Sequence, residues 1–301
     1  MQASDVSRAA AAAKWVARSL GLDVDSAVVL HNSNKLAVRL APSSVLARVA
    51  PLGRQNLQFE IELARQLAEA ASPVAALAPG VKPRVYEHDG FAVTLWTYYE
   101  SATPPGVSAA DYAGALERLH AGMRELDVTS PRFTDRVAEA QLLVSSRDLS
   151  PALSDADREL LVDALRERRR AIGERGAPEQ LLHGEPHPGN VLATSHGPLF
   201  IDFETCCRGP VEFDLAHAPE AVSDRYPDVD QGLLGDCRGL VLAMVAAWRW
   251  DPGDQFPGGQ REGRDLLRAL RQGPPWPTLD GLVRTSAGLP RPRRPPTDTC
   301  H

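Results

Sequence analysis

The chain is poor in cysteine, and its few cysteines are not arranged as pairs. Four occur in 301 residues: Cys206 and Cys207 are adjacent, whereas Cys237 and Cys300 stand alone. No CxxC spacing is present, so neither a disulfide framework nor a cysteine zinc motif is expected. This usage is typical of proteins that remain in a reducing compartment. The sequence therefore predicts a cytoplasmic protein without structural disulfides.

A surplus of positive charge and a long apolar run are also missing. The formal net charge is −6, which disfavours a nucleic-acid partner and agrees with a soluble surface or a cationic substrate. The longest apolar candidate, residues 239–248, has half of the ~20 residues that span a bilayer. The alanine-rich run at 9–13 is followed by Lys14 and Arg18, which indicates a helix and not a signal peptide. We expect no membrane partner.

Apolar periodicity predicts an ordered succession of strands and helices in the first third of the chain. Apolar residues are 43% of the sequence and charged residues 24%, as in ordinary globular proteins. The pattern predicts a helix at 4–20, strands at 27–30, 36–40 and 44–50, a helix at 57–70, and strands at 83–88 and 91–96. Asp89-Gly90 is a strong hairpin turn between the last two strands. Several α+β folds share this order.

The remaining two thirds are mostly helical in pattern. Ser108 is placed to cap a helix that runs to about residue 126. Further helices are predicted at 134–143, 154–175, 211–222, 232–250 and 259–270. From residue 273 onward prolines are frequent and periodicity is lost, so residues 273–301 are predicted to be a disordered tail.

The most informative segment runs from residue 183 to residue 204. A polar loop with Pro and Gly at 183–190 precedes two short apolar runs that can pair as a hairpin. This pairing brings Glu185, Asn190 and Asp202 to one end of the hairpin. Carboxylate and amide oxygens suit a hard divalent cation, and Mg²⁺ usually shares its ligands with phosphate oxygens and water.

These residues resemble the catalytic and metal loops of the aminoglycoside phosphotransferase family. His183, Gly184, Asn190 and Asp202 match the family pattern of His-Gly-Asp, four residues, Asn, and a later Ile-Asp-Phe, whereas Glu185 stands in place of the catalytic Asp. The resemblance covers residues 25–250. It implies an α+β, bilobal, protein-kinase-like fold, with an antiparallel sheet and one main helix in an N-lobe at 1–98. A mostly helical C-lobe would occupy 99–272.

The resemblance also implies an activity. The chain would be a small-molecule kinase that moves the γ-phosphate of ATP, or of GTP, to a hydroxyl of a small acceptor, which would be aminoglycoside-like or otherwise cationic or polar. Asn190 and Asp202 would hold Mg²⁺, and Glu185 would orient the hydroxyl as the base. Glu is one methylene longer than Asp, and a displacement of about 1 Å can cost ~100-fold in rate. The protein would act as a monomer or homodimer.

The resemblance assigns a phosphate-binding cation to the third strand. Arg48 occupies the place of the kinase lysine in Val45-Leu46-Ala47-Arg48-Val49. Arginine keeps the charge and binds phosphate bidentately. In the next helix Glu60 is the expected partner of Arg48, with Glu62 as second choice.

Other nucleotide contacts are expected from two loops. No glycine-rich signature lies between Leu30 and Leu36, so Asn32, Ser33 and Asn34 are the candidate phosphate donors there. At the end of the fifth strand, Trp96 and Tyr98 are placed to offer backbone groups to the adenine.

The resemblance assigns structural roles to other residues. Asp214, in Phe213-Asp214-Leu215-Ala216, would brace the catalytic loop, His183 would orient that loop, and His120 would pack nearby. The acidic residues of the C-lobe would lie on the surface or line the binding site of a cationic acceptor. They are Glu220, Asp224, Asp228, Asp230, Asp236, Asp251 and Asp254.

Three other interpretations stay open at this point. A zinc enzyme is suggested by His183-Gly184-Glu185, half of a deaminase signature, but the Pro-Cys-x-x-Cys half is missing. A pseudokinase would bind nucleotide or a metabolite without transfer. A kinase with another acceptor, such as choline, methylthioribose, homoserine, a fructosamine or a macrolide, would keep the chemistry, and fold alone does not choose among these.

Overall fold

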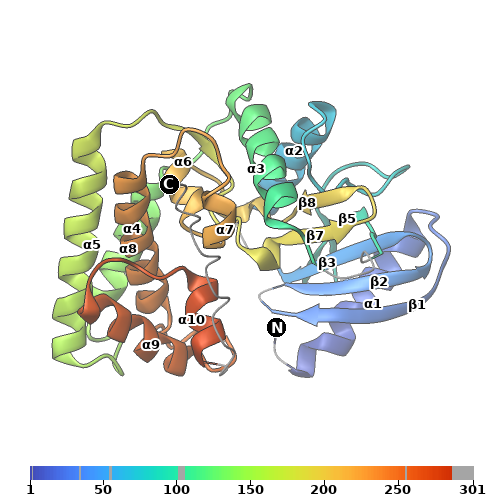
Figure 1. Cartoon of the computed structure of the whole chain (residues 1–301). Coiled ribbons are helices and arrows are strands. Elements are labelled where there is room, and N and C mark those ends of the chain that lie inside the picture. Colours follow the sequence, from blue (N-terminus) through green and yellow to red (C-terminus); the bar gives the residue numbers. More distant parts are fainter. Residues whose placement is uncertain (2, 34, 54–55, 101–105, 255, 287–301) are drawn as a thin grey trace.

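An antiparallel sheet forms the N-terminal part of the molecule (Figure 1). The computed structural model describes residues 1, 3–33, 35–53, 56–100, 106–254 and 256–286. The sheet has the strand order β1-β2-β3-β5-β4. Its strands are β1 (Val24–Asn32), β2 (Leu36–Pro42), β3 (Val45–Pro51), β4 (Tyr86–His88) and β5 (Phe91–Thr97).

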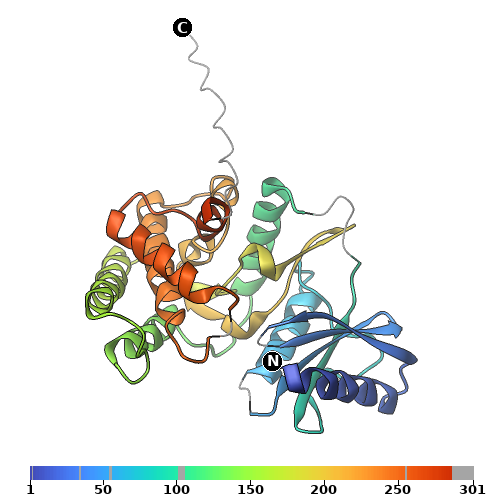
Figure 2. The same cartoon turned by 90° about the horizontal axis from the view of Figure 1, so that it is seen from below.

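The two faces of this sheet carry different side chains, because successive residues of a strand point to opposite faces. One face buries aliphatic residues such as Val38 and Val49 against helix α1 (Ala3–Ser19), which lies along the sheet in Figure 2. The opposite face carries Arg48 toward helix α2 (Leu57–Glu69). A slip of one residue in β3 would move Arg48 into the apolar face, so the burial pattern fixes the register.

Helices make up most of the rest of the molecule, and α4, α5, α8 and α9 lie together at the end away from the sheet (Figure 1). Ser108 and Ser154 cap α3 and α5 by accepting hydrogen bonds from Asp111 and Asp157 backbone N–H groups. The longer helices are α3 (Ala109–Arg124), α4 (Phe133–Ser145), α5 (Asp155–Arg175), α8 (Gln231–Trp248) and α9 (Gly259–Gln272).

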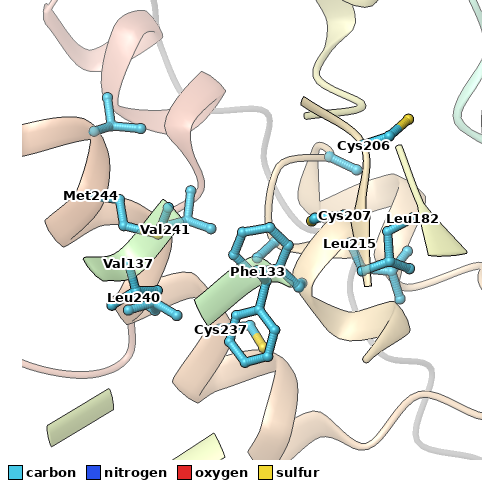
Figure 3. Close-up of a cluster of buried hydrophobic side chains, with 14 of the residues drawn as sticks. Phe133, Val137, Leu182, Cys206, Cys207, Leu215, Cys237, Leu240, Val241 and Met244 are labelled. Carbon is cyan, nitrogen blue, oxygen red and sulfur yellow. The ribbon is translucent and has the colours of Figure 1, made fainter. Parts of the chain in front are cut away.

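A continuous apolar core joins these helices to α2. Figure 3 shows part of it, where Phe133 lies between Leu240 and Val137 on one side and Cys207 on the other. Cys206 and Cys207 are buried, as is Cys237. Burial raises the pKa of Cys207 to about 12, so this thiol is neutral and behaves as a small apolar group.

The chain differs from the sequence prediction between residues 180 and 223. A single helix over 211–222 is wrong, because the segment divides into α6 (Val211–Leu215) and α7 (Glu220–Ser223). Pro219 begins α7 as its N-cap and cannot continue α6, since proline lacks the N–H that a helix interior needs. The short paired strands β6 (Gln180–Leu182) and β9 (Cys207–Gly209) were not predicted. Strand β4 begins three residues later than expected.

The prediction of a disordered tail from residue 273 is wrong for its first part. Helix α10 spans Leu279–Ser286, and Trp276 packs on α8 beside Gly239. A Cβ atom at Gly239 would lie 2.9 Å from the Trp276 ring, so the missing side chain makes room for the indole. Arg168 lies over the same ring at 5.9 Å. Residues 287–301 of the predicted tail lie outside the described residues.

Candidate active site

The hairpin predicted from the sequence places Asn190 and Asp202 at one end. Strands β7 (Val191–Thr194) and β8 (Gly197–Phe200) pair in antiparallel register. The backbone N–H of Ile201 donates to the carbonyl of Asn190 at 3.0 Å, so Asn190 lies next to the residue before Asp202. Asp202 has φ 70°, a left-handed conformation that is uncommon for a residue with a side chain and concentrates at functional sites.

Asp214 braces the loop that precedes the hairpin, as expected. Its fully buried carboxylate accepts the backbone N–H groups of His183 and Gly184 at 2.9 and 2.8 Å, and it pairs with His120 Nε2 at 2.9 Å. Burial would raise the pKa of Asp214, but the hydrogen bond and charge of His120, together with His183 and the Gly184 N–H group, lower that pKa overall. His120 is itself held by Tyr226. The loop is therefore fixed through its backbone.

Glycine is required at position 184 by both conformation and space. Its φ is +89°, and a Cβ atom there would lie 2.0 Å from the carbonyl oxygen of Thr205. His183 Nε2 makes a 3.0 Å hydrogen bond to the carbonyl of Ile201, which ties the loop to the strand before Asp202. The hydroxyl of Tyr112 donates to the carbonyl of Pro186.

The Glu185 carboxylate pairs with Arg136 from α4, a residue that sequence reasoning missed. Arg136 also donates to the Gly184 carbonyl at 2.9 Å and lies over the Trp248 ring at 5.1 Å. Burial would raise the pKa of Glu185, but the charge and hydrogen bond of Arg136, together with the nearby histidines, lower it overall, so the carboxylate is ionised at neutral pH. An ionised Glu185 can accept a proton.

His217 is a second missed residue on this side of the site. It is 4% exposed, and burial lowers its pKa to about 4, so the imidazole is neutral at pH 7. Glu185 and Arg136 both lie close enough to act on its charge. Within the described part of the chain, its Nε2 atom has no hydrogen-bond partner.

On the sheet side, Arg48 and Glu60 meet as predicted. Arg48 pairs with Glu60, which is fully buried in α2, and its Nη2 lies 2.6 Å from Asp202 Oδ2. Burial would lower the pKa of Arg48, but Glu60 and Asp202 raise it well above its usual range. Glu62, the second choice as partner, instead pairs with Arg65 on the surface of α2 at 2.6 Å.

Lys35 completes this side of the site and was missed by sequence reasoning. It lies in the turn before β2, and its Nζ is 2.9 Å from Glu60, 3.1 Å from Asp202 and 2.8 Å from Glu204. The side chain is 5% exposed, and the carboxylates raise its pKa against the effect of burial. We call Lys35, Arg48, Glu60, Asp202 and Glu204 the charge cluster.

Two of the predicted phosphate donors of the β1–β2 turn, Asn32 and Ser33, do not join the charge cluster. Asn32 donates its side-chain amide to the carbonyl of Met1 at 3.1 Å and is exposed. Ser33 donates to the carbonyl of Lys35 through its hydroxyl at 3.4 Å and its backbone N–H at 3.2 Å. Asn34 lies outside the described residues. In the described part of the turn, Lys35 joins the charge cluster, whereas Asn32 and Ser33 do not.

The residues predicted for the adenine use their donors within the protein. The Trp96 indole donates to Thr94 Oγ1 at 2.8 Å, and Arg48 lies over its ring at 6.0 Å. The Tyr98 backbone N–H donates to the carbonyl of Ser44 at 2.9 Å, and Arg39 lies 4.3 Å over the Tyr98 ring. Tyr98 thus has no backbone donor left for a base.

The oxygen ligands at the end of the hairpin fit a hard metal cation that also binds phosphate oxygens. Asn190 donates its amide N–H to the Glu185 carbonyl at 3.0 Å, which leaves the amide oxygen for a ligand. The charges of Arg48 and Lys35 lower the pKa of Asp202 despite its burial, so its carboxylate is ionised. One amide and one carboxylate leave ligand positions for phosphate oxygens and water.

A zinc site receives no support from the same residues. His183 Nε2 is bonded to the Ile201 carbonyl, and His187 Nδ1 accepts the Gly189 backbone N–H at 3.0 Å. Cys206 and Cys207 are neutral thiols, because burial raises their pKa values. In the described ranges no group of three or more His, Cys, Asp and Glu residues is suited to a metal.

Comparison with solved structures gives many neighbours of the same fold. A choline/ethanolamine kinase family protein from Mesorhizobium loti has a TM-score of 0.63 at 16% identity, covering 87% of this chain and 93% of that one. An amicoumacin kinase, solved with AMP-PNP, Ca²⁺ and its antibiotic, has a TM-score of 0.64 at 13% identity, covering 90% and 96%. A spectinomycin phosphotransferase, solved with ADP and spectinomycin, has a TM-score of 0.61 at 12% identity, covering 91% and 97%.

These neighbours confirm the protein-kinase-like fold that the resemblance implied. A search of curated proteins returned no match. Among the described residues, no helix has the length and apolarity needed to cross a bilayer. The model of the phosphotransferase enzyme family matches residues 25–272, most of the chain. The chain belongs to this family, as the pattern around His183 and Asp202 indicated.

Proposed function

We propose that this protein transfers the γ-phosphate of ATP, or of GTP, to a hydroxyl group of a small polar molecule. One observation carries the proposal. Asp202 lies between two cations on the sheet side, Lys35 and Arg48. The ionised Glu185, in the loop that precedes the hairpin, pairs with Arg136 on the helix side. Phosphoryl transfer needs positive charge at the phosphates and an acceptor for the hydroxyl proton, and these two sides supply them.

Each residue has a chemical task in this proposal. Asn190 and Asp202 would hold Mg²⁺, which neutralises phosphate charge when it is bound. Arg48 and Lys35 supply further positive charge to the phosphates. Glu185 orients the acceptor hydroxyl and takes its proton, and Arg136 keeps that carboxylate ionised until then. Asp214 holds the loop still during transfer.

The acceptor is a small hydroxyl compound of the kind that the neighbours' names suggest. Those proteins are named for choline or ethanolamine, spectinomycin and amicoumacin. An antibiotic acceptor would make the protein a resistance enzyme. Three of the C-lobe acids give no argument for an acidic wall around a cationic acceptor, because Asp230 caps α8, Asp236 pairs with Arg168 and Arg175, and Asp254 pairs with Arg249. We place the reaction in the cytoplasm, where cysteine thiols stay reduced and nucleotide is present.

A panel of acceptors tests this function. The purified protein is incubated with ATP or GTP, Mg²⁺ and one acceptor at a time: aminoglycosides, spectinomycin, amicoumacin, choline, ethanolamine and related amino alcohols. Phosphorus NMR then reports a new phosphate ester. We expect at least one acceptor to be phosphorylated, and Glu185→Gln to lose that activity. Glu174→Gln, which alters an exposed helical carboxylate, is the matched control and should keep it.

Two outcomes would contradict the proposal. Nucleotide-dependent thermal stabilisation without transfer to any acceptor would support the pseudokinase interpretation. A fully active Glu185→Gln protein would remove Glu185 from its role as base.

A further inference from the structure

Lys35 is held where a metal ion would bind. Three carboxylates lie within 3.1 Å of its ammonium group, and one of them belongs to Asp202. Both Asp202 oxygens already face cations, since Lys35 approaches Oδ1 at 3.1 Å and Arg48 approaches Oδ2 at 2.6 Å. A metal ion that binds Asp202 therefore competes with these two cations for the same carboxylate oxygens.

Building on the proposed function, we infer that Lys35 is an exchangeable counter-ion that occupies the carboxylate of Asp202, the proposed metal ligand, until a nucleotide phosphate takes it. Metal and nucleotide then bind together, because the phosphate that draws Lys35 away frees Asp202 for the metal. Lys35 excludes free divalent cations in the absence of nucleotide and holds the phosphates in its presence.

Lys35 is better suited to this exchange than Arg48. Arg48 lies inside β3, in register with Ala37 of β2 and Thr94 of β5, and its planar guanidinium bridges Glu60 and Asp202. Lys35 lies in the connection before β2 and carries a compact ammonium group on a flexible stem. The ammonium can turn from one oxygen to another without moving the sheet.

The charges of the cluster also favour this exchange. Two cations, Lys35 and Arg48, face three carboxylates, Glu60, Asp202 and Glu204. Neutralising Lys35 would remove one positive charge from beside Glu60, Asp202 and Glu204, which would strengthen their attraction for a free divalent ion. At the same time it would remove a charged donor from the phosphates. The inference thus predicts effects of opposite sign on metal binding and nucleotide binding.

Metal titration of the whole chain tests the first effect. Mn²⁺ binding to the nucleotide-free protein is followed by electron paramagnetic resonance, for the wild type, Lys35→Met and the matched control Lys82→Met, which alters an exposed lysine. We expect Lys35→Met to bind Mn²⁺ about tenfold more tightly than the wild type, the size of one charged hydrogen bond. It should bind a non-hydrolysable ATP analogue with Mn²⁺ about tenfold more weakly. Lys82→Met should match the wild type in both.

Lysine NMR on the wild type gives a second measurement that needs no substitution. The chain contains three lysines, Lys14, Lys35 and Lys82, so side-chain ¹⁵N labelling gives few signals to assign. The Lys35 signal should shift with the ATP analogue and Mg²⁺ together, and should stay in place with Mg²⁺ alone at the same concentration.

The possible failures can be told apart. The inference is wrong, even if phosphate is transferred, in either of two cases. Lys35→Met binds free Mn²⁺ no more tightly than the wild type, or the Lys35 side-chain signal does not shift when the ATP analogue and Mg²⁺ are added. If Lys35→Met does not fold, the NMR result decides alone. If the wild type binds no nucleotide at all, the proposed function itself fails.

Discussion

On the sheet side of the site Asp202 shares two cations with two other carboxylates, whereas on the helix side Glu185 has Arg136 as its ion-pair partner. The first arrangement has several alternative pairings of similar geometry. The second is fixed, because Arg136 also holds the Gly184 carbonyl and stacks on Trp248. We therefore expect the sheet side of the site to rearrange more readily than the loop that carries Glu185.

The largest expected effect comes from the sheet side. Asp202→Asn removes the anion that Lys35 and Arg48 share and the carboxylate assigned to the metal. We expect the rate of phosphate transfer to fall about 100- to 1000-fold, as when one preorganised electrostatic group is lost. Steady-state transfer to the acceptor found in the panel measures it, with the exposed Asp25→Asn as control. A loss below tenfold would refute the assignment of Asp202.

The fixed backbone of the helix side is tested at Gly184. Gly184→Ala adds strain at φ +89° and a clash with the Thr205 carbonyl, so the free energy of unfolding should fall by about 4 kcal/mol. Gly21→Ala has a similar φ of +81° but nothing within 4 Å, so it should cost about 1 kcal/mol. Urea unfolding of both variants gives the comparison. Equal losses would mean that the loop moves to accept the methyl group.

The buried His217 makes the helix side sensitive to acid. Its pKa is about 4 in the folded protein against 6.5 for an ordinary histidine, so below pH 6.5 the unfolded chain binds more protons. Stability should therefore fall as the pH falls from 6.5 to 4, by up to about 3 kcal/mol. His217→Gln should lack this part of the loss, whereas the exposed His196→Gln should keep it. Urea unfolding across this pH range measures the free energy of unfolding of both proteins. If it falls equally in the wild type and in His217→Gln, the burial argument is wrong.

The smallest effect separates the charge of Arg136 from its packing. Arg136→Met keeps a long apolar side chain near Trp248 but removes the charge that lowers the pKa of Glu185. That pKa should rise, so the acidic limb of the pH profile of kcat/KM should move to higher pH. Arg166→Met, in an exposed pair on α5, is the control. If the acidic limb does not move, it reports the ionisation of a group other than Glu185.

The parts of the site that were predictable depend on residues close together in the sequence. The turn between β7 and β8 fixes where Asn190 and Asp202 lie, and alternation along β3 fixes the face on which Arg48 meets Glu60. The bracing role of Asp214 followed from the family pattern and is confirmed by its hydrogen bonds. Local geometry accounts for the hairpin, whereas Arg48, Glu60 and Asp214 were predicted through the family resemblance, and Asp214 lies 31 residues from His183.

The missed residues depend on contacts between distant segments. Lys35 is 167 residues from Asp202, and Arg136 is 49 residues from Glu185. No spacing rule joins such pairs, because their approach is set by how α4 and the sheet pack on the hairpin. Lys35 offered one signal, a charged residue directly before the buried Leu36, where a long side chain can reach inward. Arg136 and His217 offered none.

Helix α2 has a consequence for attempts to dissect the molecule. Its buried residues Ile61, Leu63 and Leu67 belong to the same apolar cluster as Leu116 of α3 and Phe200 of β8, not to the cluster beneath α1. A fragment that ends at residue 98 would therefore expose the apolar surface of α2 and aggregate. Heating the intact chain should give one cooperative melting transition, because neither half can lose its structure without uncovering the other.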